Sequence, residues 1–257
     1  MKVLYVDVDG TLVGPAGDLF SNGSIRVAEA MLRARQAGLT LVPVSGRGRL
    51  QVSELCRLLG FERGIAELGC IHLSGLRGPN AMVGHDVRYE LGGFPFSGET
   101  PVEAMQSRGA VRVVLERGLE PHDPWNEGRE ATYLFRGSAD PATINRALAE
   151  AGFGWCELVD NGVLNRQPDG HVHAYHLAPA GTGKAVGVRL DRLHHGLAID
   201  DTAYVGDSAS DLDCASEVGS CWLVANADGD LDWPQRTSAP YGAGVAEVID
   251  RLLDAVQ

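Results

Sequence analysis

Residues 2–12 of the chain read KVLYVDVDGTL, and this stretch predicts the fold. It opens with a short apolar run rich in β-branched residues, which is typical of a strand buried in a parallel sheet. Asp7 and Asp9 stand at alternate positions near its end, and Gly10 then lets the backbone turn away sharply. We therefore expect both aspartates at the carboxyl edge of a sheet, where α/β proteins bind their ligands.

The same alternation of strands and helices occurs towards both ends of the chain. Residues 2–78 contain the apolar runs KVLYVDV and LTLVPV, each followed by a segment with helical periodicity. Residues 182–257 contain the runs TAYVGD and CWLVAN between further helical segments. Such alternation indicates βαβ units and a parallel sheet. The sequence thus predicts an α/β fold with a Rossmann-like core.

The middle of the chain has a different pattern. The runs ATYLFR, WCELVD and HVHAYHL alternate apolar with polar residues, which is typical of an open sheet with one solvated face. The turn-rich segments SGLRGPN and LAPAGTG precede and follow this part. We therefore expect a core domain formed by residues 1–79 and 179–257, with an α+β domain of residues 80–178 inserted into it.

Composition and charge narrow the class of protein. The chain has 257 residues, of which 44% are hydrophobic and 22% charged, as in an ordinary globular protein. The net charge of −12 argues against nucleic acid and anionic membranes as partners. No apolar run approaches the ~20 residues of a spanning helix, and the N-terminus does not resemble a signal peptide. The five cysteines show no C-x-x-C spacing, so we expect reduced thiols and a cytoplasmic location.

Residues with catalytic potential follow the other predicted strands as they follow the first. They are Ser45, Gly46 and Arg47 after LTLVPV, Asp207 and Asp211 after TAYV, and Lys184 at the predicted start of a helix. Several carboxylates that converge on one edge would repel one another unless a hard divalent cation lay among them, and oxygen ligands of this kind suit Mg²⁺. With Ser45 and Lys184 as donors, such an edge can bind a phosphoryl group, which one carboxylate can attack while another handles protons.

Lys184 is an unusual residue for this chain, which has 20 arginines and only two lysines. It stands behind two glycines at the expected start of a helix, where a cation is unfavourable unless an anion lies nearby. The string GTGK resembles part of a nucleotide-binding P-loop, but Ala178 and Ala185 occupy positions where that motif requires Gly and Ser or Thr. A P-loop is therefore rejected.

In combination, these motifs resemble the haloacid dehalogenase-like (HAD) phosphohydrolases. DVDGTL is similar to the first motif of that superfamily, VPVSGR to the second, Lys184 to the third and VGDSASD to the fourth. The position of the insert, between the second and third motifs, resembles the C2 type of cap domain, and its mixed α/β pattern resembles the Cof-like branch, which includes sugar-phosphate phosphatases. Two positions depart from that branch, because Leu68 replaces an expected Asn in ENG and Ser210 replaces an Asn in the fourth motif.

The resemblance implies a role for each motif residue. Asp7 would be the nucleophile that forms an aspartyl-phosphate, and Asp9 the general acid and base. Mg²⁺ would bind to the carboxylates of Asp7 and Asp207 and to the backbone carbonyl of Asp9. Ser45, Gly46 and Lys184 would bind the phosphoryl oxygens, and Asp211 would lie in the second shell of the metal or orient Lys184.

Residues that select the substrate are harder to identify from sequence. The candidates are Arg47, Arg166, His171 and His173, together with Arg129 and Arg136. A guanidinium could pair with a carboxylate or a second phosphate of the substrate, and His171 or His173 could face the cleft from one side of a strand. The alternative for each of them is an ordinary residue on a solvated surface.

These observations predict a Mg²⁺-dependent phosphatase that hydrolyses a small phosphorylated metabolite, either a sugar phosphate or a compound of the phosphoglycerate type. One alternative is a phosphomutase that uses the same aspartyl-phosphate and returns the phosphate to its substrate. Another is a non-catalytic, regulatory binding protein that keeps the fold. The sequence does not predict an oligomeric state.

Overall fold

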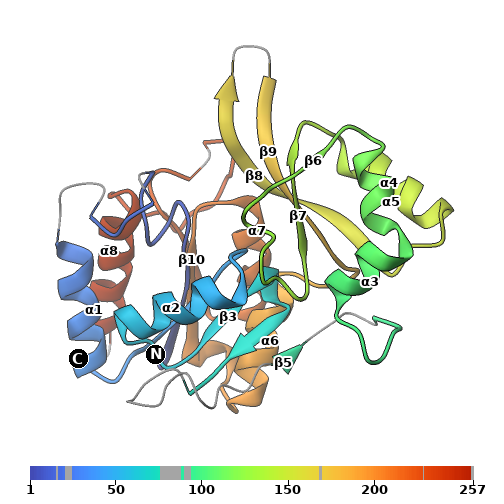
Figure 1. Cartoon of the computed structure of the whole chain (residues 1–257). Helices are drawn as coiled ribbons and strands as arrows, with labels where there is room; N and C mark the ends of the chain where they lie inside the picture. Colours follow the sequence, from blue (N-terminus) through green and yellow to red (C-terminus); the bar gives the residue numbers. More distant parts are fainter. Residues whose placement is uncertain are drawn as a thin grey trace.

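The structure is a computed structural model that describes residues 1–15, 17–20, 25–75, 88–89, 94–167, 170–227 and 229–255, without the side chains of residues 88–89, 165–167 and 170. It contains a seven-stranded sheet and a four-stranded sheet, which lie one beside the other (Figure 1). Within the described part of the chain, none of the helices combines the length and the apolar character that crossing a bilayer needs.

The larger sheet is built mainly from parallel strands. In spatial order its strands are β11 (Ser220–Leu223), β10 (Thr202–Gly206), β1 (Val3–Asp7), β2 (Thr40–Val44), β3 (Gly64–Ala66), β4 (Ile71–Leu73) and β5 (Arg88–Tyr89). Neighbours from β11 to β3 are parallel, whereas β4 and β5 join in the antiparallel sense. All five residues of β1 are buried, as expected for a central strand covered on both faces. The predicted parallel sheet is confirmed.

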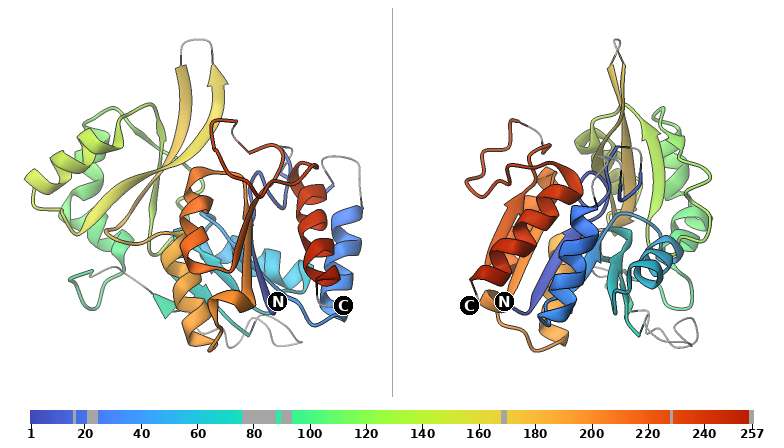
Figure 2. Two further views of the ribbon diagram at one scale, coloured as in Figure 1. Left: turned by 180° about the vertical axis from the view of Figure 1, so that it is seen from behind. Right: turned by 90° about the vertical axis from the view of Figure 1, so that its left-hand side faces the viewer.

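Helices cover both faces of this sheet (Figure 2). Leu4 and Val6 of β1 pack in one cluster with α1 (Arg26–Gln36), α2 (Arg49–Leu59) and α8 (Tyr241–Asp254). Val3 and Tyr5, which alternate with them, pack in a second cluster with α6 (Lys184–His194) and the 3₁₀ helix η3 (Asp213–Glu217). The remaining short helices are η1 (Glu67–Gly69), η2 (Ile199–Asp201) and α7 (Ala209–Leu212). The fold is therefore the α/β arrangement that the sequence predicts.

The smaller sheet is antiparallel throughout. Its order is β6 (Glu120–Pro121), β7 (Tyr133–Gly137), β9 (Gly170–Pro179) and β8 (Cys156–Gln167). Three helices, α3 (Pro101–Arg108), α4 (Ala110–Leu115) and α5 (Pro141–Glu150), pack on one of its faces, where Phe135 and Tyr175 are buried in the shared core. The domain boundaries at residues 80 and 178 stay a prediction. Strand β5, inside the predicted insert, pairs with β4 of the larger sheet.

Two backbone segments touch where the larger sheet meets the start of α6. A Cβ atom at Gly69 would lie 2.2 Å from the carbonyl oxygen of Gly183 and 3.2 Å from the amide nitrogen of Gly187. Gly69 also has a φ of +93°, which favours glycine. Because Gly183 immediately precedes Lys184, this approach fixes the position from which the lysine side chain starts.

We predict that Gly69→Ala destabilises the protein by about 2–4 kcal/mol. A methyl group there adds a backbone clash, typically ~1–3 kcal/mol, to the ~1 kcal/mol cost of a left-handed alanine. Gly118→Ala is a matched control, since Gly118 has a φ of +87° and nothing lies within 4 Å of its would-be Cβ. Urea unfolding of the two variants measures the difference, and equal losses would show that the approach at Gly69 is not constraining.

Candidate active site

The residues that the sequence places after separate strands converge at the carboxyl edge of the larger sheet. Asp7 is the last residue of β1, Ser45 directly follows β2, and Asp207 directly follows β10. Lys184 opens α6, and Asp211 lies in α7. These residues come together because the carboxyl ends of parallel strands lie at one edge of the sheet.

Lys184 lies between two buried carboxylates. Its Nζ donates to Oδ1 of Asp7 at 2.7 Å and to Oδ1 of Asp211 at 2.8 Å. All three side chains are at most 5% exposed. Burial alone would lower the pKa of Lys184, but the charges of Asp211 and Asp7 together raise it above its usual value. The ammonium is therefore charged, and with two carboxylates around it the group keeps an excess of negative charge.

Asp211 has every lone pair engaged by the protein. Besides Lys184, its Oδ1 accepts from the hydroxyl of Tyr204 at 2.6 Å. Its Oδ2 accepts from the backbone amides of Asp207 and Ser208, at 3.1 Å and 3.0 Å, and from the Ser208 hydroxyl at 2.7 Å. Burial raises the pKa of Asp211, but the Lys184 charge and these hydrogen bonds bring it below its usual value. Such a carboxylate is suited to holding Lys184 and the turn after β10 in place.

Asp7 and Asp207 are less completely compensated. Carboxylate oxygens of Asp7, Asp207 and Asp211 lie within 4.8 Å of one another. Burial, and then the charges of the neighbouring acids, raises the pKa of Asp7 well above its usual range despite Lys184. Burial and the charge of Asp211 raise the pKa of Asp207 to about 6, although its Oδ1 accepts from the hydroxyl of Thr11 at 2.8 Å.

This donor set fits a hard divalent cation. Asp211 is saturated by protein donors, which leaves the oxygens of Asp7 and Asp207 crowded together without matching positive charge. Carboxylate oxygens in this arrangement are the ligands that Mg²⁺ prefers. Gly10, with a φ of +86°, makes room for them, because a Cβ atom there would lie 2.4 Å from Oδ2 of Asp207.

Asp9 and Arg47 form the exposed side of the same cluster. The Asp9 side chain is 58% exposed, and the Arg47 guanidinium binds it through Nε at 2.9 Å and Nη2 at 2.6 Å. The backbone amide of Arg47 donates to the hydroxyl of Ser45 at 3.1 Å. The structure thus brings Arg47, a predicted selectivity residue, to this edge.

The two predicted histidines lie on the face of the smaller sheet that points away from the carboxylate cluster, opposite to the face of His176. His171 and His173 alternate along β9 with His176, and they share a face with Tyr175, whose ring is buried against the helices. The His173 ring stacks on Tyr175 and its Nδ1 lies 2.8 Å from Oδ2 of Asp160. The structure therefore does not bring His171 or His173 to the carboxylate cluster, because the packing of Tyr175 sets the orientation of the whole strand.

His176 lies at the carboxyl edge of the larger sheet but is not among the site residues predicted from the sequence. It is 2% exposed, and its imidazole lies against Gly46, next to Ser45. The signal that could have found it is the alternation of β9, once the bulky Tyr175 is assigned to the core of the smaller domain.

The three remaining arginine candidates differ in their surroundings. Arg129 is buried, and its Nη2 donates to the carbonyl oxygen of Gly46 at 2.7 Å. Arg136 pairs with Glu120 at 3.2 Å on an exposed surface. The side chain of Arg166 lies outside the described residues. Of the two described, only Arg129 contacts the segment that carries Ser45.

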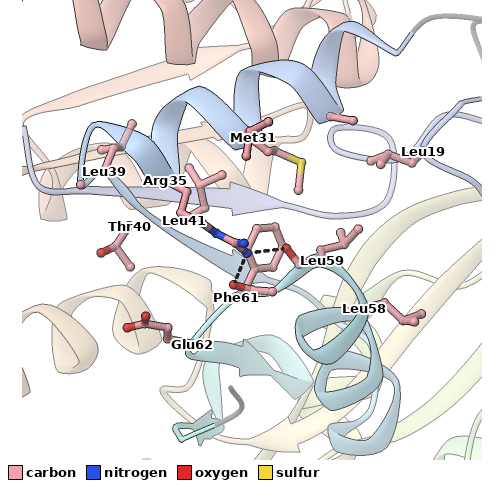
Figure 3. Close-up of a pocket in the computed structure, with 14 residues that line it drawn as sticks. Leu19, Met31, Arg35, Leu39, Thr40, Leu41, Leu58, Leu59, Phe61 and Glu62 are labelled. Atoms are coloured by element: carbon pink, nitrogen blue, oxygen red, sulfur yellow. Dashed lines mark hydrogen bonds between the residues drawn. The ribbon is translucent and has the colours of Figure 1, made fainter. Parts of the chain in front are cut away.

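A pocket of about 440 Å³ lies away from this cluster, at the amino end of β2. Figure 3 shows that its walls are mainly apolar, with Met31, Leu41 and Phe61 between α1 and the end of α2. The guanidinium of Arg35 crosses it and donates to the carbonyl oxygens of Leu59 and Gly60, at 3.4 Å and 3.0 Å. None of the predicted site residues lines this pocket.

The chain is similar over nearly its whole length to proteins named phosphoglycolate phosphatase. The relative from Saccharolobus solfataricus, phosphoglycolate phosphatase 1, is 37% identical, with 98% of this chain and 96% of the relative covered. That from Staphylothermus marinus is 36% identical over 99% and 98% of the two chains. The relative from Metallosphaera sedula is 30% identical over 98% and 99%. No protein-family profile matches the chain.

Solved structures share the fold at lower sequence identity. A Thermoplasma acidophilum protein has a TM-score of 0.70 at 19% identity, covering 98% of this chain and 97% of that one. A haloacid dehalogenase-like hydrolase from Bacteroides thetaiotaomicron has a TM-score of 0.68 at 18% identity, covering 98% and 99%. Taken with the full-length relatives, this likeness makes the chain a member of the haloacid dehalogenase-like hydrolase superfamily and, within it, a phosphatase of small metabolites.

Proposed function

We propose that the protein is a Mg²⁺-dependent phosphomonoester hydrolase that works through a phosphorylated Asp7. The observation that carries the proposal is the buried contact of Lys184 with Asp7, beside Ser45, with an exposed carboxyl group two residues further on at Asp9. A nucleophile, a cation for the phosphoryl group and a group that can exchange protons with solvent thus lie together at one edge.

In the first step, a carboxylate oxygen of Asp7 attacks phosphorus, and the bond from phosphorus to the ester oxygen breaks. The leaving oxygen takes a proton from the carboxyl group of Asp9. In the second step, Asp9 removes a proton from a water molecule, whose oxygen attacks phosphorus and breaks the bond to Asp7. Inorganic phosphate leaves, and both aspartates return to their starting states.

The remaining residues bind and orient the phosphoryl group. Lys184 and the Ser45 hydroxyl would donate to its oxygens together with the backbone at Gly46, and Asp211 would keep Lys184 in position. The carboxylates of Asp7 and Asp207 and the backbone carbonyl of Asp9 would hold Mg²⁺. When bound, the ion supplies positive charge that offsets the crowded carboxylates and the incoming phosphate.

The relatives, and not these core residues, support the proposed substrate class. Proteins 36–37% identical to this chain are named phosphoglycolate phosphatases, so phosphoglycolate is the first compound to test among phosphoglycerate-type substrates and sugar phosphates. The five cysteines are all buried and free, which supports the proposal of a reducing, cytoplasmic location.

A screen for phosphate release tests the proposed reaction. With Mg²⁺ present, we expect the wild-type protein to release phosphate from at least one of these compounds, and Asp7→Asn to lose more than about 10³-fold in kcat because the nucleophile is gone. Asp232→Asn, a change of the same kind at an exposed position, is the control. Activity that survives in Asp7→Asn would exclude the phosphorylated aspartate. A requirement for a sugar bisphosphate would favour a phosphomutase, and no release from any compound would favour a binding protein.

We predict that Lys184→Arg folds and loses at least about 100-fold in kcat. The planar guanidinium is larger than an ammonium and aims its donors differently, so it cannot reach Asp7 and Asp211 at 2.7 Å and 2.8 Å in the same buried space. Lys2→Arg is the matched control, because the only other lysine has a side chain that is 64% exposed. Circular dichroism checks folding, and a near-wild-type rate for Lys184→Arg would mean that the lysine has no special role.

Mg²⁺ should stabilise the folded chain. We expect a saturating concentration to raise Tm by about 5 °C, as roughly 2–3 kcal/mol of binding free energy does in a chain of this size. Chelation by EDTA should remove the shift and the activity together. Asp207→Asn should shift much less, since it lacks one of the proposed ligands. A shift of the same size in Asp207→Asn would contradict the assignment of this carboxylate.

A further inference from the structure

We propose that His176 and Asn161, both on the smaller sheet, recognise a carboxylate group that the substrate carries beside its phosphoester. This inference rests on the proposed function and adds to it the residues that select the substrate. Neither residue is among those that the sequence motifs single out.

Both side chains lie over the segment that binds the phosphoryl group. A Cβ atom at Gly46 would be 3.0 Å from Nε2 of His176 and 3.2 Å from Nδ2 of Asn161. Gly46 has no side chain, so the two nitrogen atoms can approach the backbone beside Ser45. A substrate whose phosphoryl group is bound at Ser45 and Lys184 would place its other end near these two groups.

The surroundings of His176 make its Nε2 a hydrogen-bond donor. Its Nδ1 lies 3.5 Å from Nη2 of Arg129 and 3.3 Å from the hydroxyl of Thr132. A guanidinium carries no lone pair that could accept a hydrogen from Nδ1, so the ring proton is assigned to Nε2. Arg129 itself is occupied, because its Nη2 donates its two hydrogens to the carbonyl of Gly46 at 2.7 Å and to Thr132 at 2.6 Å. The arginine thus sets the direction of the histidine without contacting the substrate.

The charge around His176 favours an anion. Burial, and then the positive charges of Arg129 and Lys184, hold the pKa of the imidazole well below its usual value, so the ring is neutral. Arg129, which lies 4.0 Å from the buried carboxylate of Glu67, brings its positive charge within 3.5 Å of Nδ1. This nearby charge stabilises a carboxylate at Nε2 more than it stabilises a sugar hydroxyl. A neutral donor next to a positive potential is suited to an anionic acceptor.

A β-bulge directs Asn161 towards Gly46. The register between β8 and β9 shifts between Asp160 and Val163, and Gly162 in this stretch has a φ of +97°. The amide of Gly162 donates to Oδ1 of Asp160 at 2.8 Å, and His173 holds the other carboxylate oxygen from the neighbouring strand. Bulges next to active sites commonly re-aim a side chain in this way. His173 therefore supports the site from behind the sheet and does not face the substrate.

The test compares two substrates in the full-length protein with Mg²⁺. Phosphoglycolate carries a carboxylate beside its phosphoester, and p-nitrophenyl phosphate does not. We expect His176→Leu to lower the ratio of kcat/KM for phosphoglycolate to that for p-nitrophenyl phosphate by about 10–100-fold, the usual effect of losing a hydrogen bond to a charged group. His176→Gln, which keeps an N–H group near the position of Nε2, should recover most of that ratio.

A second variant decides the question if His176→Leu does not fold. Asn161 is exposed, so Asn161→Asp should fold normally. Its added negative charge should repel the carboxylate and lower the same ratio at least tenfold, mainly through KM. His171→Leu, on the other face of β9, separates the two histidine hypotheses. A fall in the ratio for His171→Leu together with none for His176→Leu would overturn the inference.

The outcomes also separate this inference from the proposed function. Equal losses on both substrates would mean that His176 and Asn161 only support the fold, and no loss on either would mean that they do not contact the substrate. In both cases the phosphatase activity itself stands. Wild-type protein that releases no phosphate from any phosphomonoester would instead refute the proposed function.

Discussion

The contact on which the rest of this structure depends is the buried ammonium of Lys184 between Asp7 and Asp211. It joins β1 to the start of α6 and to the turn after β10, segments that are 177 and 27 residues apart along the chain. Buried ion pairs of this kind contribute little to stability, because desolvation offsets most of the attraction. One cation among three acids also leaves the site with excess negative charge. The arrangement makes chemical sense when a divalent cation and a phosphate complete the charge balance.

Close backbone approaches make this concentration of charge possible. A Cβ atom at Gly206 would lie 2.3 Å from the Cγ of Asp211, and one at Gly10 would lie 2.4 Å from Oδ2 of Asp207. At both positions a carboxylate of the cluster occupies the space that a side chain would fill. Glycine at these two positions therefore lets the carboxylates of Asp207 and Asp211 approach the backbone closely.

The site could be predicted from sequence wherever it depends on local order along the chain. Asp7 ends an apolar strand, Ser45 and Asp207 each directly follow one, and parallel strands bring their ends to one edge without further information. The side of the smaller sheet that faces the site could not be predicted in this way. In HVHAYHL, His171 and His173 lie on one face of the strand and His176 on the other. Only the packing of Tyr175 against three helices decides that His176 is the one that points towards Gly46. That packing depends on residues far away in the sequence.

The turn at Glu67 and Leu68 connects the backbone around Ser45 to residues 130–132, which directly precede β7 of the smaller sheet. The backbone amides of Glu67 and Leu68 donate to the carbonyl oxygens of Arg47 and Ser45, at 3.0 Å and 3.2 Å. Both residues have left-handed backbones, with φ values of +50° and +57°, which cost about 1–2 kcal/mol each.

The buried carboxylate of Glu67 offsets this strain through bonds to the smaller domain. It accepts from the backbone amides of residues 130, 131 and 132, at 3.3 Å, 2.9 Å and 2.9 Å. Arg129, from the same stretch, binds the carbonyl of Gly46 and orients His176. Ser45 would bind the phosphate, and His176 would bind the rest of the substrate. The short, strained turn at Glu67 and Leu68 therefore fixes the two residues relative to each other, and neither can move without disturbing the other.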